Sequence, residues 1–240
     1  MDAGMAFDLG RCYSCVARRT GLCSVLSDNA LMRFKKIAHR RRYAAGEHIF
    51  SGEEQTDFFA SVCSGVVKLT KVLFDGRQQV VGLLLAPDTV GRICRKRSPY
   101  FAEAATDVEL CCFPHGSFEQ MLDGVPELKQ RLLEQTLDEL DSARDWMVLL
   151  GRKTAEERVA SLFLMLATRA NCSDYSEQIQ RDSLGLDLHL KRQEIGDFLG
   201  LSYETVCRQI TALKKKGLIE QPGRRRFRIP DTEALTRTAG

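Results

Sequence analysis

The sequence predicts an α+β fold: a strand-rich roll, then a long helix, then a small helical domain that carries a basic hairpin. Three observations favour it. Short runs rich in apolar, β-branched and aromatic residues alternate with glycine-containing turns from about residue 41 to residue 113. A segment with helical periodicity extends from Pro126 to Lys153 without a further proline. Two short amphipathic segments joined by Gly200-Leu201 follow within residues 190–219.

Length and composition limit the class of protein. The 240 residues suffice for two domains that each bury a core, and 44% apolar with 28% charged residues argues against wholesale disorder. No run is apolar enough to span a membrane, and the first twenty residues lack the apolar core of a signal peptide. We therefore expect a cytoplasmic protein without membrane association, in which clustered cysteines indicate metal or redox chemistry.

The strand-rich part contains five apolar runs separated by turns: HIF (48–50), FFASVC (58–63), VVKLTKVL (66–73), QQVVGLLL (78–85) and VELCCF (108–113). Asp75-Gly76 lies between two of these runs and is a hairpin signal. Regularly spaced short strands predict a β-sandwich, roll or barrel.

The long helix carries a seam of residues spaced by four and three: Thr136, Leu140, Ala143, Met147 and Leu150. One interpretation is a helix lying on its own domain. The other is a homodimer helix, because a short seam between two domains needs a partner. Arg144 and Asp145 flank the seam, so we expect weak and adjustable pairing. A second helix follows in TAEERVASLFLMLATRA.

The two short segments predict a helix-turn-helix. Ser202 is a good N-cap for the second helix, whose Val206, Ile210 and Leu213 fall on one side. Polar residues fall on the opposite side, which is the arrangement that a helix needs to enter the major groove of DNA. With the residues that flank this face and one arginine of the basic segment that follows, the predicted DNA-binding set is Ser202, Tyr203, Glu204, Cys207, Arg208, Thr211, Lys215 and Arg225.

A basic hairpin follows the second helix. Pro222-Gly223 predicts its turn, and Arg224, Arg225, Arg226 and Arg228 follow, which is typical of a wing that contacts phosphates. Residues 188–228 have a net charge of +6 and the rest of the chain −3. The alternative interpretation is a solvated run of charges on a small domain. The glycine turn, the two-faced helix and the basic hairpin occur together, and this combination favours the DNA-binding interpretation.

The chain resembles the cAMP receptor protein/FNR family of bacterial transcription regulators. The stretches that carry the resemblance are GEHIFSGEEQTDFFASVCSGVVKL, KTAEERVASLFLML and LSYETVCRQITALKKKGLI, and the similarity is greatest to FnrL-type proteins of the FNR branch. The resemblance implies a roll like the cyclic-nucleotide-binding jelly roll. It also implies a homodimeric, oxygen-sensing activator with a [4Fe–4S] cluster, which contacts RNA polymerase where Asp75-Gly76-Arg77 lie. The expected domains are 1–30 (cysteine-rich, cluster-binding), 31–124 (sensory β-roll), 125–153 (dimerisation helix) and 154–240 (winged helix-turn-helix).

Two departures from the family pattern carry predictions. FNR proteins usually have Glu-x-x-Ser-Arg on the recognition helix, whereas here Cys207 replaces the serine before Arg208. We expect Cys207 either to be a redox-sensitive thiol next to DNA or to fill the space of serine inertly. The stretch VGRICRKRSPYFAEAA fits the phosphate pocket of nucleotide-binding relatives poorly, so we expect no cyclic nucleotide.

Nine cysteines, an odd number, argue against a complete disulfide framework. Cys12, Cys15 and Cys23 supply three thiolates with arginines among them, and thiolates are ligands of iron–sulfur clusters and of zinc. The resemblance selects Cys111, three residues before Pro114, as the fourth ligand, and strand alternation places Cys112 on the opposite face. The other candidates are more typical of small buried hydrophobes: Cys63, Cys94, Cys112 and Cys172.

Alternatives remain open at this point. Spacing alone does not separate a [4Fe–4S] cluster from zinc or from thiol-only redox regulation on the same fold. An iron–sulfur electron carrier belongs to a different class, against which the helix-turn-helix and the basic wing argue. No nucleophile–base pair and no phosphate-binding loop is visible, so we do not expect an enzyme.

Overall fold

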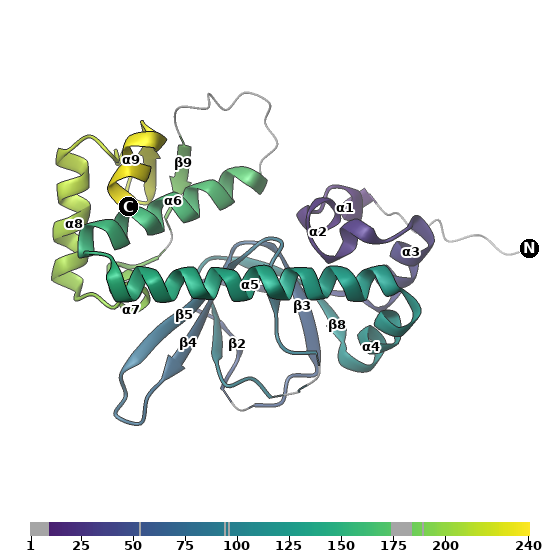
Figure 1. Cartoon of the computed structure of the whole chain (residues 1–240). Coiled ribbons are helices and arrows are strands. Elements are labelled where there is room, and N and C mark those ends of the chain that lie inside the picture. The colour runs from purple at the N-terminus through teal and green to yellow at the C-terminus, as the bar shows by residue number, and fades with distance from the viewer. Residues whose placement is uncertain (1–9, 53, 94, 96, 174–183, 189) are drawn as a thin grey trace, which may run out of the picture. The chain divides into compact units, whose positions relative to one another are not determined.

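The computed structural model describes residues 10–240 except 53, 94, 96, 174–183 and 189, and it leaves the side chains of residues 170–173 undescribed. The chain divides into two units, one with residues up to 71 and 82–140, the other with 72–81 and 141–240. The division falls within α5 (Pro126–Arg152), the long helix that the sequence predicts (Figure 1). Within the described ranges, no helix combines the length and the apolar character that crossing a membrane requires.

The first unit contains two four-stranded sheets. One has the order β1-β8-β3-β6, with β1 (His39–Tyr43), β8 (Val108–Pro114), β3 (Phe58–Ser64) and β6 (Thr89–Val90). The other has the order β2-β7-β4-β5, with β2 (His48–Phe50), β7 (Phe101–Ala104), β4 (Val66–Val72) and β5 (Gln78–Leu85). Buried side chains from both sheets share one core, so the strands form the predicted roll.

Helices cover the outer face of the first sheet. They are α1 (Gly10–Tyr13), α2 (Val16–Arg19), the 3₁₀ turn η1 (Leu22–Val25), α3 (Asp28–Ile37) and α4 (His115–Gly124). Phe59 and Phe113 leave that face of the sheet and pack with Phe34 and Phe118 in a second core. The ring centroids of Phe34 and Phe113 are 4.2 Å apart. The N-terminal segment is therefore held by the same aromatic cluster that covers the strand bearing Cys111.

Some elements differ from the sequence prediction. The five predicted runs become β2, β3, β4, β5 and β8, and Gly76 has a φ of +84° in the predicted hairpin turn. Strand β1, with the sequence HRRRY, has no apolar alternation because it lies at the sheet edge with most side chains exposed. Helices α3 and α4 and the short strands β6 and β7 are not among the predicted elements, although Ser27 caps α3 and Leu31 and Phe34 form its buried face.

The second unit is built around α6 (Ala155–Ser173). It further contains β9 (Leu184–Asp187), α7 (Arg192–Leu199), α8 (Tyr203–Lys215), β10 (Arg226–Ile229) and α9 (Thr232–Ala239). Phe163 of α6 and Phe227 of β10 pack edge to face with centroids 5.0 Å apart. The predicted hairpin at Pro222-Gly223 closes by one bridge between Glu220 and Arg228, but the main partner of β10 is β9. The wing is thus a two-stranded sheet of β9 and β10 with an isolated bridge at Glu220, rather than an isolated hairpin.

Candidate thiol pocket and nucleic-acid interface

Three predicted ligands lie on successive short turns near the start of the described chain. Cys12 lies in α1, Cys15 directly precedes α2, and Cys23 lies in η1. The Cys15 amide donates to the Cys12 carbonyl at 3.1 Å. Turns of four residues have little stability alone. Their position therefore depends on packing, chiefly of Leu22, which is fully buried in the second core.

The fourth predicted ligand, Cys111, lies on β8 at the outer face of the first sheet. In the strand register it stands opposite Arg40 of β1 and Ser61 of β3. Its neighbour Cys112 is only 2% exposed and packs between the two sheets. Strand alternation therefore separates these two thiols as the sequence predicts, and places Cys111 on the face that the N-terminal turns cover.

These four cysteines line one pocket with about 400 Å³ of space. Its other walls include apolar and basic side chains: Leu31, Phe34, Phe113, Arg11, Arg18, Lys35 and Arg40. Within the described part of the chain, no three His, Cys, Asp or Glu side chains are arranged to hold a metal ion. A zinc ion needs its thiolates about 2.3 Å from one point, whereas a four-iron cluster is held by thiolates around a larger core. Four thiols in one pocket supply the donor type that both groups take.

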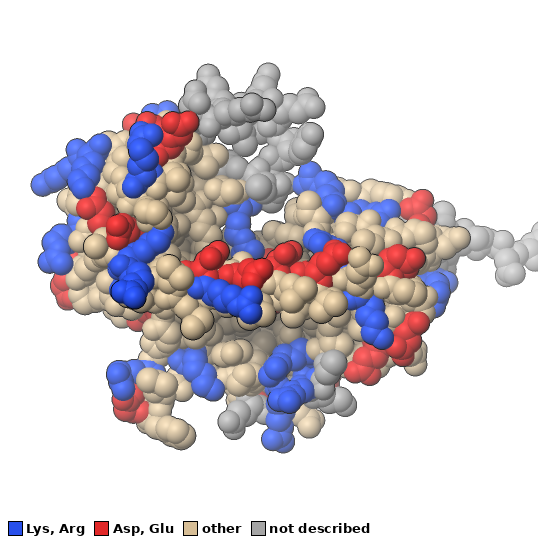
Figure 2. Space-filling model, in the orientation of Figure 1, with Lys and Arg blue, Asp and Glu red and all other residues tan. Residues whose placement is uncertain are grey.

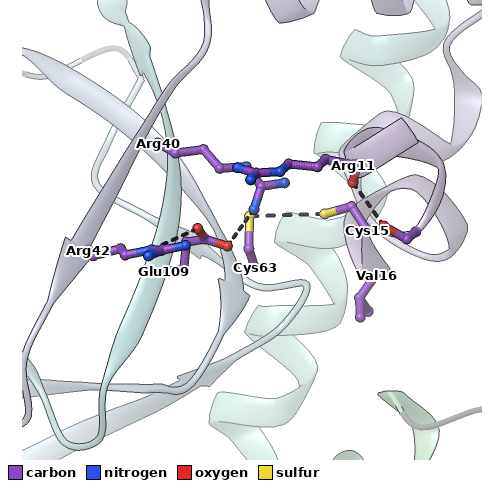
Figure 3. A pocket seen from close by; sticks show the side chains of 8 residues that line it. Arg11, Cys15, Val16, Arg40, Arg42, Cys63 and Glu109 are labelled. Atoms are coloured by element: carbon purple, nitrogen blue, oxygen red, sulfur yellow. Dashed lines mark hydrogen bonds and ion pairs between the residues drawn. The ribbon is translucent and has the colours of Figure 1, made fainter. Parts of the chain in front are cut away.

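Cys63 is a fifth thiol at this site, and the expectation that it is a buried hydrophobe is wrong. Its side chain is half-buried, and its Sγ atom lies 4.0 Å from Sγ of Cys15 (Figure 3). Cys63 also shares a hydrogen bond with Cys111. The signal was present in the sequence, because Cys63 follows Phe59 and Ser61 at a spacing of two and so shares their outward face. Cys94 and the side chain of Cys172 lie outside the described structure.

The surroundings of these thiols favour the protonated form. Burial and the neighbouring thiols raise the pKa of Cys23 to about 12, against the opposing effect of Arg18. A hydrogen bond with Cys111 and burial raise the pKa of Cys63 to about 12. A hydrogen bond with Cys63, followed by burial, raises the pKa of Cys15 far above its usual range. Because the thiolate is the form that ligates metal, loading this pocket must release protons.

The second unit contains the predicted helix-turn-helix. Helix α7 ends at Gly200, which has a φ of +64°, and Ser202 caps α8 by accepting a hydrogen bond from the Thr205 amide at 3.2 Å. The turn also requires Gly196, because a Cβ atom there would lie 2.5 Å from the Leu201 carbonyl oxygen. Val206, Ile210 and Leu213 of α8 are buried as predicted. The recognition helix is therefore rigidly packed on one side.

The predicted DNA-contacting side chains lie largely on the solvent side of this unit. Glu204 and Arg208 are exposed one turn apart on α8, and Cys207 between them is half-buried. The remaining members are also exposed: Ser202, Tyr203, Thr211, Lys215 and Arg225. Figure 2 shows Lys and Arg side chains gathered over the part of the surface where α8 lies. This face offers both groups that can read bases and cations that can contact phosphates.

The wing arginines differ in their pairing. Arg228 forms an ion pair with Glu220 at 2.7 Å, whereas Arg224, Arg225 and Arg226 are exposed at the turn and at the start of β10. The Glu220 pairing fixes the second strand of the wing, which leaves the arginines nearer the turn available for phosphates. Nothing in the sequence distinguishes Arg228 from the other wing arginines, because its contact with Glu220 depends on how the two sides of the wing align.

Comparisons with known proteins agree with this architecture. Residues 40–124 match the cyclic nucleotide-binding domain family, and residues 157–238 match the Crp-like helix-turn-helix domain family. The chain is 43% identical to the transcriptional activator protein FnrL of Cereibacter sphaeroides over 232 residues, which is 97% of this chain and 93% of that protein. It is 45% identical to a probable transcriptional activator of Rhizobium leguminosarum bv. viciae over 226 residues, 94% of this chain and 92% of that protein.

A solved structure has a similar fold. FixK2 from Bradyrhizobium japonicum matches 85% of this chain and 98% of its own with a TM-score of 0.74 and 29% sequence identity. These similar proteins are transcription regulators rather than enzymes, as the sequence predicts.

Proposed function

We propose that this chain, which belongs to the FNR branch of the cAMP receptor protein/FNR family of transcription regulators, is an oxygen-responsive homodimeric activator. In this proposal Cys12, Cys15, Cys23 and Cys111 hold a [4Fe–4S] cluster. The observation that carries it is that these four thiols, separated by up to 99 positions in the sequence, line one pocket. When bound, such a cluster supplies a redox group that reacts with oxygen.

The pocket has charges suited to an anionic group. Four thiolates outweigh the smaller net positive charge of the iron–sulfide core that they ligate, so nearby cations stabilise the loaded state. Arg11, Arg18 and Arg40 all line the pocket. Phe34 and Phe113 also line the pocket, and these buried rings limit the access of water. These side chains therefore position and shield the ligands.

The cysteine-bearing turns contact the first half of α5, which gives the site a route to the dimer helix. The Arg131 guanidinium of α5 donates to the Thr20 carbonyl at 2.7 Å. Leu128 and Leu132 of the same helix pack in the core that contains Leu22. A change at the cysteines that moves these turns therefore alters the hydrogen bond and the apolar packing that hold the first half of α5. We propose that oxygen acts on the regulator through this contact.

The seam on α5 is suited to a second copy of the chain. Leu140 and Met147 of the predicted seam are 45% and 72% exposed, and Leu133, seven residues before Leu140 and outside the predicted seam, is 60% exposed. An exposed apolar stripe of this period is typical of a two-helix coiled coil. Because the stripe is short, a cluster-dependent change of a few kcal/mol in the free energy of dimerisation suffices to shift the balance between monomer and dimer. The dimer then presents two α8 helices to a palindromic operator similar to TTGAT-N4-ATCAA.

The test is anaerobic purification followed by absorption spectroscopy, iron and acid-labile sulfide analysis, and titration of an operator fragment. We expect a brown protein with about four irons per chain. We further expect that air exposure lowers both operator affinity and the dimer fraction in sedimentation, and that added cyclic AMP has no effect. Stoichiometric zinc without sulfide would favour the zinc alternative, and iron with no operator binding would favour the electron carrier. A dimer and operator affinity unchanged by air would refute oxygen control.

A further inference from the structure

Cys63, the fifth thiol of the site, lies next to the thiol of Cys15. Cys63 of β3 and Cys15, 48 positions earlier, come from separate elements, and their side chains point toward one another in Figure 3. The register of β3 against β8 shifts between Val62 and Ser64, so Cys63 is the extra residue of a bulge and has no partner opposite it. Cys63 is thus placed at the site without being one of the four proposed ligands.

The distance between the two sulfurs suits a covalent bond. A disulfide has an S–S length of about 2.05 Å, so closing the present 4.0 Å gap requires a movement of roughly 2 Å. Cys15 lies at the junction of two four-residue turns, α1 and α2, where rotation and small backbone adjustments are inexpensive. Cys63 lies on a strand that is paired on either side of the bulge. A small adjustment of the Cys15 turn can therefore bring its sulfur to Cys63.

The two thiols share a pocket that suits an anionic reagent. The pocket has about 290 Å³ of space, and Arg11, Arg40 and Arg42 line it together with Cys15 and Cys63. Its single carboxylate, Glu109, is paired with Arg40 at 2.5 Å and with Arg42 at 3.2 Å. Three cations against one anion give an excess of positive charge, which raises the local concentration of an anionic small disulfide. Oxidised glutathione is a disulfide of this class.

From these contacts we infer that Cys15 and Cys63 form a disulfide in the cluster-free protein by exchange with an anionic low-molecular-weight disulfide. Cys63 loses its proton to solvent, and its sulfur attacks one sulfur of the reagent, which breaks the S–S bond of the reagent and releases the first small thiol once the leaving sulfur has taken up a proton. The Cys15 thiolate then attacks the Cys63 sulfur of the mixed disulfide and releases the second. Two protein thiols lose two electrons and two protons, and the reagent gains both. The bond withholds Cys15 from the cluster until a thiol reductant reopens it, a consequence that rests on the proposed function.

The covalent bond is tested on the full-length protein after anaerobic iron chelation. Oxidised glutathione is added, free thiols are alkylated, and tryptic peptides are analysed without reduction. Residues 12–18 and 43–68 are tryptic peptides, and fragmentation of their cross-linked pair distinguishes Cys15 from Cys12. We expect a Cys15–Cys63 cross-link that dithiothreitol removes. A cross-link to Cys12 or Cys111 instead, or glutathione retained on Cys63, overturns the inference.

Iron uptake tests the consequence. Oxidised parent protein is expected to lose most of its capacity for anaerobic reconstitution, and dithiothreitol is expected to restore it. The Cys63→Ser variant is expected to reconstitute equally before and after oxidation, whereas Cys112→Ala, which removes a thiol buried between the sheets, is expected to behave like the parent. Equal losses in Cys63→Ser and the parent, or no iron in reduced Cys63→Ser, overturn the inference. A reduced parent that takes up no iron refutes the proposed function instead, and the cross-link is still judged by its peptide.

Discussion

The Nη1 atom of Arg18 lies 2.7 Å from the carbonyl oxygen of Cys23, to which it donates a hydrogen bond. The same atom donates to the Leu26 carbonyl at 2.7 Å, and Nη2 lies 3.6 Å from an Asp28 oxygen. One half-buried guanidinium thus fixes the turn that presents the third proposed ligand. The sequence predicts for Arg18 only a general charge effect on the thiols, whereas the structure gives this side chain a positioning role.

Replacing Arg18 is expected to loosen this turn. Arg18→Gln removes charge-assisted hydrogen bonds to Cys23 and Leu26 and should lower the free energy of unfolding by about 1–3 kcal/mol. Urea unfolding of the cluster-free protein measures this loss, and iron retention during gel filtration measures ligand positioning. Arg19→Gln removes an exposed arginine of the same turn and is the matched control. Equal effects in the two variants would show that charge, not the Cys23 bond, matters.

Single substitutions distinguish ligands from neighbouring thiols. Cys12→Ser, Cys15→Ser, Cys23→Ser and Cys111→Ser should each abolish the brown colour and the acid-labile sulfide, because a four-cysteine site has no spare ligand. Cys112→Ala should retain both, because its side chain packs between the sheets. Absorption spectra with iron and sulfide analysis of anaerobic preparations provide the measurement. A cluster that survives in Cys111→Ser would remove Cys111 from the set.

The contact between Arg131 and Thr20 is expected to couple the cysteine-bearing turns to α5. Arg131→Ala leaves every proposed ligand in place, so iron content and spectrum should match those of the parent. The affinity difference between cluster-loaded and air-exposed protein for operator DNA should shrink by about 1–3 kcal/mol, the usual size of a coupling between sites. Fluorescence anisotropy under both conditions measures it. Lys129→Ala, at an exposed position on the same helix, should keep the full difference.

Substitutions in the second unit should distinguish residues that read bases from residues that contact phosphates. Arg208→Ala should lose about 1–3 kcal/mol on the specific operator, because an exposed arginine of the recognition helix can pair with guanine. Glu204, one turn earlier, can accept from a cytosine amino group. Arg225→Ala should weaken specific and random DNA alike and reduce the salt slope by about one. Equal losses on random DNA for Arg208→Ala would make Arg208 a phosphate contact.

Local sequence patterns predict the helices and strands of this chain better than they predict the contacts between residues that are far apart in the sequence. The two-faced pattern of α8 and the period of α5 depend on near neighbours, so they are visible in the sequence. Strand β1 is recognisable only by its pairing with β8, because its arginines lie at a sheet edge. The role of Cys63 likewise depends on a residue 48 positions away. Nothing in the sequence around Cys63 indicates that Cys15 is its partner.

Cys207 is expected to be a second site, besides the cluster, at which oxidation weakens DNA binding. It is half-buried on α8 beside Arg208, and its hydrogen bond with Tyr203 raises the pKa of that phenol. Oxidation to sulfenic or sulfinic acid would add bulk and negative charge next to DNA phosphates, which weakens binding without touching the cluster site. Cluster-free protein that retains weak operator binding is treated with hydrogen peroxide and compared with Cys207→Ser. We expect only the parent to lose binding and a thiol reductant to restore the sulfenic fraction. If both proteins lose binding equally, or neither does, Cys207 merely fills the space of the serine that this family usually carries.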